Sequence, residues 1–104
     1  MDYADSEELA QRRIGSLLNG RWRIVRPIAA GGSAWLFVGV DEKGGPAAAI
    51  KVLHSGLLEY PEVVARFLRE AKVANTIGHS GSVRVLDEGR APDRVPFLAM
   101  ELLE

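Results

Sequence analysis

Short apolar blocks separated by glycine, proline and polar residues recur along this chain. Most of these blocks are runs of four to seven residues bounded by turn residues, a pattern that predicts β-strands. The longer segment 61–77 has apolar residues at helical spacing instead, with Pro61 near its start and Gly78 just past its end. Because hairpin-length connections join most elements, we expect an α+β fold, a five-stranded antiparallel sheet with one main helix. The predicted strands are residues 22–28, 35–40, 47–53, 83–86 and 96–100.

The third predicted strand, residues 47–53, contains one polar residue, Lys51, among apolar neighbours. A lysine is almost never fully buried unless it is paired with an opposite charge. The sequence therefore raises the question of which residue Lys51 faces.

The predicted helix offers a partner on its apolar stripe, which consists of Val63, Phe67, Ala74 and Ile77. Glu70 falls on the same stripe, three residues after Phe67 and four before Ala74. An acid on the buried face of a helix and a base in a buried strand would each be stabilised by meeting the other. The alternative is that the lysine reaches water along its own stem and that the glutamate is simply solvated.

The N-terminal residues 1–17 predict a polar leader that precedes a single domain at residues 18–104. Ser6 is a candidate helix cap, followed by acidic residues in the first turn. No apolar face follows that would fix this segment to a core, so we expect it to be loosely attached.

The bulk composition excludes several classes of function. The net charge of −1 gives no basic face for nucleic acid, and the absence of cysteine excludes disulfides and thiol chemistry. His54 and His79 have no metal-ligand spacing. No run approaches the roughly 20 apolar residues of a membrane span, and the N-terminus lacks a signal-peptide pattern. We therefore expect a cytoplasmic chain without a membrane segment.

The loop between the first two predicted strands consists of small residues, from Ala29 to Ala34. Small residues let a ligand approach the backbone closely, and successive N–H groups can form a nest for phosphate oxygens. A plain hairpin turn is the alternative explanation.

Four stretches together resemble the N-terminal lobe of the protein-kinase fold, in the form found in bacterial serine/threonine kinases of the eukaryotic-like type. They look like its opening strand, its V-A-I-K strand, its central helix and its last strand running into the hinge between lobes. The spacing from Lys51 to Glu70 is also that of the family. The resemblance covers roughly residues 18–104, and the four stretches are Gly20–Ile24, Ala48–Leu53, Arg66–Ala71 and Phe97–Leu103.

The resemblance implies two candidate catalytic residues. Lys51 would contact the α- and β-phosphates of ATP, and Glu70 would hold Lys51 in place. The resemblance also implies an adenine site, covered from above by two apolar side chains and bounded by the hinge backbone. The implied ATP-binding residues besides Lys51 are Ala29, Gly31, Gly32, Ser33, Leu36, Ala49, Met100, Glu101 and Leu103.

The glycine loop departs from the family pattern G-x-G-x-x-G-x-V. Ala29 stands at the first glycine position, Ala34 at the third and Leu36 at the valine position, while Gly31 keeps the middle one. Each alanine adds a methyl group and disfavours positive φ, which puts the grip on phosphate in question. After the helix, His79 opens a segment that differs from the usual H-P-N-I-V, and we expect this histidine to be structural.

The 104 residues contain neither an H-R-D nor a D-F-G sequence. Phosphoryl transfer needs the aspartate and the magnesium-holding groups of those motifs. The resemblance therefore implies truncation at the hinge, a missing C-terminal lobe as partner, and Mg²⁺ held by that lobe rather than by a metal site here. We expect this chain alone not to phosphorylate protein, and we expect marginal stability and self-association, with Leu102 and Leu103 in solvent.

Two alternatives remain open at this point. The first is a non-catalytic, pseudokinase-like or partner-binding module, favoured by the altered glycine loop. The second is an unrelated α+β scaffold with coincidental matches. The sequence does not identify a protein substrate.

Overall fold

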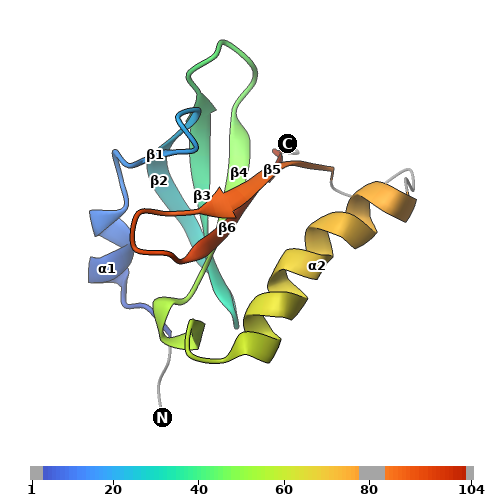
Figure 1. The fold of residues 1–104 in the computed structure, drawn as a ribbon. Helices are drawn as coiled ribbons and strands as arrows, with labels where there is room; N and C mark the ends of the chain where they lie inside the picture. Colours follow the sequence, from blue (N-terminus) through green and yellow to red (C-terminus); the bar gives the residue numbers. More distant parts are fainter. Residues whose placement is uncertain (1–3, 78–83, 103–104) are drawn as a thin grey trace.

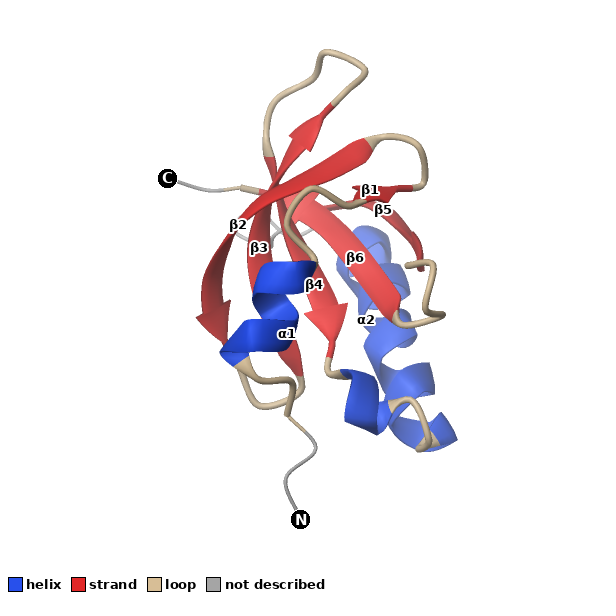
Figure 2. Ribbon diagram, turned by 90° about the vertical axis from the view of Figure 1, so that its left-hand side faces the viewer, coloured by secondary structure: helices blue, strands red, loops and turns tan. Residues whose placement is uncertain are grey.

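The computed structural model describes residues 4–77 and 84–102. Its strands form one six-stranded antiparallel sheet in the order β1-β2-β3-β4-β6-β5. A short helix, α1, lies against one face of the sheet and the long helix α2 lies against the other (Figures 1 and 2). The elements are α1 Glu7–Arg12, β1 Leu17–Leu18, β2 Trp22–Ala30, β3 Ala34–Asp41, β4 Ala48–Leu53, the 3₁₀ turn η1 Ser55–Leu57, α2 Pro61–Ile77, β5 Val85–Arg90 and β6 Pro96–Glu101.

The predicted α+β architecture is confirmed, with one strand more than expected. The additional strand β1 consists of Leu17 and Leu18, which pair with β2. Two residues are too few to show the alternation of apolar and polar positions that predicts a strand. The bounds predicted for the long helix are those observed.

The strand predicted at residues 83–86 was placed too early. In the structure β5 runs from Val85 to Arg90, so Asp87 and Glu88 belong to the strand and not to the following turn. These polar residues are compatible with a strand because β5 is at the edge of the sheet, where one side is open to water.

The N-terminal leader is not loosely attached, which corrects the prediction. Ser6 caps α1 as expected, accepting a hydrogen bond from the Leu9 N–H at 3.2 Å. Ala10 on this helix is 1% exposed and belongs to the hydrophobic core. Asp5 adds polar contacts, since its carbonyl accepts from the Trp35 indole N–H at 2.8 Å and its carboxylate accepts from the Ser55 N–H at 3.0 Å.

The strand register divides the sheet into two faces. Ile50 lies opposite Phe37 on β3 and Ala99 on β6, and all three are fully buried. Alternate residues of a strand point to opposite faces, so Ala49 and Lys51 point the other way. Lys51 contacts α2, which identifies its face as the one that α2 covers in part.

Candidate nucleotide-binding site

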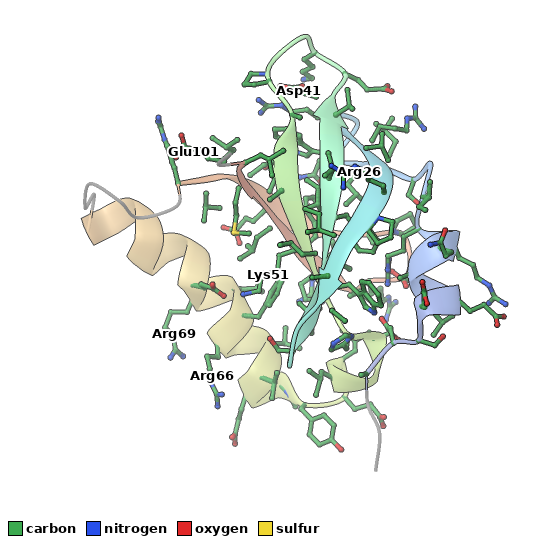
Figure 3. The ribbon with its side chains drawn as sticks, turned by 180° about the vertical axis from the view of Figure 1, so that it is seen from behind. Arg26, Asp41, Lys51, Arg66, Arg69 and Glu101 are labelled. Carbon is green, nitrogen blue, oxygen red and sulfur yellow. The ribbon has the colours of Figure 1, made fainter. Side chains whose placement is uncertain are left out.

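Lys51 and Glu70 meet, as the sequence predicts. The Lys51 ammonium on β4 lies 3.1 Å from each carboxylate oxygen of Glu70 on α2. Lys51 points from the sheet toward the helix in Figure 3. Neither side chain is fully buried, because 26% of the Lys51 side chain and 48% of the Glu70 side chain remain exposed. The lysine therefore has both a partner and access to solvent.

Phe67 fixes the helix end of this pair. It is 5% exposed and lies one turn before Glu70, so its burial orients the helix face that carries the carboxylate. The Lys51 ammonium is 5.8 Å from the centre of the Phe67 ring, within cation–π range. Val63 packs against the same core, whereas the side chains of Ala74 and Ile77 lie outside the described part of the chain.

The sheet brings four of the other predicted site residues onto the face of Lys51. Leu36 lies directly opposite Lys51, and Ala29 lies opposite Leu36 on the next strand. Ala49 lies opposite Met100 on β6. Residues directly opposite each other share a face, so these five side chains line one surface that crosses four strands.

The loop of small residues forms the end of the β2–β3 hairpin. The Gly31 N–H donates to the Ala34 carbonyl at 2.8 Å, which closes the turn, and Gly31, Gly32 and Ser33 are exposed. Ala29 and Ala34 lie within β2 and β3. Positive φ in the described chain occurs outside this loop, so the alanines do not strain the backbone here.

A small pocket separates the loop from the ion pair. It has a volume of about 100 Å³ and lies between the hairpin and α2. Ser33 and Leu53 line its sheet side, and Phe67 and Glu70 line its helix side. The carboxylate of the pair thus borders the same space as the tip of the loop.

The predicted hinge residues are only partly described. Met100 and Glu101 are partly buried at the end of β6, and Leu102, expected in solvent, is also partly buried. The Glu101 N–H donates to the Arg84 carbonyl at 2.9 Å, so this N–H is not available to a ligand. Leu103 and His79 lie outside the described residues.

The sequence did not predict the position of His54 beside the loop. It indicated only that this histidine has no metal-ligand spacing. His54 is 0% exposed and contacts Gly31 through its side chain and Ser33 through its backbone. The only sequence signal was an ionisable residue directly after a buried strand.

The described residues do not supply a metal centre. Within residues 4–77 and 84–102, no group of three or more His, Cys, Asp and Glu side chains is placed to hold an ion. We therefore propose no Mg²⁺-binding residue among the described residues. Over the same residues, no helix has both the length and the apolar character that crossing a bilayer requires.

The chain is similar to bacterial protein kinases. It is 41% identical over 85 residues to the serine/threonine-protein kinase Pkn1 of Myxococcus xanthus, covering 82% of this chain and 12% of Pkn1. It is 37% identical over 95 residues to PknA of Mycobacterium tuberculosis, covering 88% of this chain and 22% of PknA. No protein-family model matches the chain.

Solved structures agree on the fold. A double mutant of the Mycobacterium tuberculosis PknI kinase domain superimposes with a TM-score of 0.69 and 23% identity, covering 86% of this chain and 35% of that domain. The resemblance to bacterial serine/threonine protein kinases is thereby confirmed. The chain has the fold of the N-terminal lobe of a kinase domain, and it spans less than a quarter of the length of Pkn1 or PknA.

Proposed function

We propose that this chain is the ATP-binding lobe of a serine/threonine protein kinase. The carrying observation is the Lys51–Glu70 pair, 3.1 Å apart on the sheet face that also presents Ala29, Leu36 and Ala49. A lysine ammonium has three N–H donors, and Glu70 engages it from the helix side. The ammonium can therefore hold its position and still donate to a phosphate oxygen.

The proposed roles follow from position. Lys51 would contact the α- and β-phosphates, and Glu70 would keep the ammonium from turning toward bulk water. Gly31, Gly32 and Ser33 would lie over the phosphates at the exposed tip of the hairpin. Leu36 and Ala49 would cover the adenine ring, with Met100 behind it and the backbone of Glu101 and Leu103 along its edge.

The chemistry of transfer would belong to a second lobe. The aspartate that receives the substrate proton and the groups that hold Mg²⁺ are absent from these 104 residues. We propose that a C-terminal lobe supplies them in the whole kinase, with ATP and a protein as its substrates. A cytoplasmic location is part of the same proposal.

Thermal unfolding with and without Mg·ATP tests the nucleotide site. A ligand that binds only the folded chain raises the melting temperature by mass action. We expect Mg·ATP to raise it for the natural sequence and for Lys43→Ala, a lysine in the exposed β3–β4 turn, but not for Lys51→Ala. An equal rise in both lysine variants would contradict the proposed role of Lys51.

A partner-binding module is the second candidate, and the alanines at the first and third glycine positions favour it. In that case Lys51→Ala would keep the stability of the natural sequence and neither chain would respond to Mg·ATP. The two candidates therefore give opposite results in the same experiment.

A further inference from the structure

The buried side chain of His54 joins the glycine loop to the N-terminal segment. Its ring is 0% exposed and lies at the end of β4, next to the hairpin tip. One ring nitrogen, Nε2, is 3.0 Å from the Gly31 carbonyl oxygen, and the other, Nδ1, accepts from the Asp5 N–H at 3.0 Å.

These two contacts determine the protonation of the ring. A backbone N–H can only donate, so Nδ1 must carry a lone pair, and the neutral imidazole then has its proton on Nε2. A carbonyl oxygen can only accept, so the Nε2–H donates to Gly31. Asp5 thus selects the tautomer that can bind the loop.

His54 holds the loop at a second point through its backbone. The His54 N–H donates to the Ser33 carbonyl at 2.9 Å. The Gly31 and Ser33 carbonyls are therefore both directed toward His54. Because the C=O and the following N–H of a planar trans peptide point in opposite directions, the N–H of Gly32 is directed away from the His54 ring.

That direction leads toward the side of Lys51. His54 is bonded to Asp5, which directly precedes the α1 region, and α1 lies on the face of the sheet opposite α2 (Figures 1 and 2). Lys51 lies on the α2 face. The ring contact behind the loop thus directs the Gly32 N–H toward the face where the phosphates are proposed to bind.

Asp5 is itself held firmly. Its carboxylate accepts from both the N–H and the hydroxyl of Ser55, and its carbonyl accepts from the Trp35 indole. The N-terminal segment is therefore bonded to β3, to η1 and, through His54, to the loop. Without this segment the Nδ1 contact would be lost.

We infer that His54 is a positioning residue for the phosphate-binding loop, and that Asp5 fixes its working tautomer. The loop-ordering role stands on the geometry above, and only its effect on nucleotide affinity rests on the proposed function. His54 touches the loop backbone and is not expected to touch ATP.

Two substitutions separate the two ring contacts. His54→Gln keeps a donor at the position of Nε2, whereas His54→Asn keeps an acceptor at the position of Nδ1 and does not reach Gly31. We expect His54→Asn to increase fast backbone motion at Gly31, Gly32 and Ser33, measured by ¹⁵N relaxation without nucleotide. His54→Gln should change these residues much less, which makes it the matched control.

The affinity for Mg·ATP should also fall more in His54→Asn than in His54→Gln. Loss of one hydrogen bond of about 1 kcal/mol corresponds to roughly a fivefold change in affinity. We expect Mg·ATP to bind about fivefold more weakly to His54→Asn than to His54→Gln. Equal loop motion in the two variants would overturn the inference even if the natural chain binds Mg·ATP. Failure of the natural chain to bind Mg·ATP would overturn the proposed function and leave the loop result valid.

The tautomer is measured on the unaltered chain, which keeps the inference testable if a variant does not fold. We expect ¹⁵N-edited spectra of the imidazole to show a protonated Nε2 and an unprotonated, hydrogen-bonded Nδ1. A proton on Nδ1 would overturn the inference. In a chain shortened to begin at Ser6, we expect this single tautomer to be lost and the loop to become more mobile, and an unchanged loop would exclude a role for Asp5.

Discussion

The Lys51 ammonium lies 3.1 Å from both carboxylate oxygens of Glu70, although one residue comes from a central strand and the other from a helix 19 positions later. Both side chains keep contact with water. A pair in this setting contributes little to stability.

The first prediction concerns the stability of this pair. In a double-mutant cycle of Lys51→Met and Glu70→Gln, we expect a coupling free energy of about 0.5 kcal/mol, because exposed ion pairs are screened and must order two long side chains. Urea unfolding of the four chains measures it. A coupling above about 2 kcal/mol would mean that the pair is mainly structural.

The second prediction concerns Phe67, the buried anchor of α2. We expect Phe67→Ala to lower the free energy of unfolding by about 3 kcal/mol, because it leaves a cavity under the helix. Phe67→Leu keeps most of the volume and should cost about half as much or less. Urea unfolding gives both values, and equal losses would show that α2 does not depend on packing at this position.

The third prediction concerns pH and the buried Asp41, which is 5% exposed. Hydrogen bonds from Arg21 and from the Lys43 N–H lower the pKa of Asp41 below its ordinary value of 3.8. The folded chain therefore takes up this proton less readily than the unfolded chain. The resulting stability is present above the ordinary value and is lost as pH falls through the lowered one.

Melting temperatures measured from about pH 5 down to the acid limit of the fold test this effect. We expect a steep fall for the natural sequence and a shallower one for Asp41→Asn, which does not titrate. Glu42→Gln is the comparison, because Glu42 also has a pKa lowered by its partner Arg23 but is far more exposed. Parallel curves for the natural chain and Asp41→Asn would contradict the assignment.

The fourth prediction concerns catalysis by these residues alone. Because the H-R-D and D-F-G sequences are absent, purified residues 1–104 should transfer no label from γ-labelled ATP to a generic protein substrate. An active kinase in the same assay is the positive control. Transfer that disappears in Lys51→Ala would contradict this expectation.

Much of the fold follows from local sequence signals. The helix 61–77 has a regular apolar stripe, a proline at its start and a glycine past its end, so its bounds were predictable. The lysine in an apolar strand and the glutamate on the helix stripe were predictable as partners because each is a charged residue at a position where the local pattern calls for an apolar one. Their half-exposed setting was not, because it depends on how far α2 covers the sheet.

Other features depend on contacts that leave no local pattern. Strand β5 carries Asp87 and Glu88 because an edge strand tolerates polar residues, so its sequence looks like a turn. The docking of the leader depends on hydrogen bonds from Asp5 to His54 and Ser55, across 49 and 50 positions. No spacing rule connects such distant residues, and the role of His54 beside Gly31 was therefore not foreseen.

The most direct test of the proposed nucleotide site is an NMR titration of the ¹⁵N-labelled chain with Mg·ATP, which reports where the nucleotide binds. We predict saturable shifts at Gly31, Gly32 and Ser33 and along the face that carries Ala49 and Met100, and their loss in Lys51→Ala. Shifts confined to other surfaces, or none at millimolar nucleotide, would contradict the claim that this lobe binds ATP at Lys51.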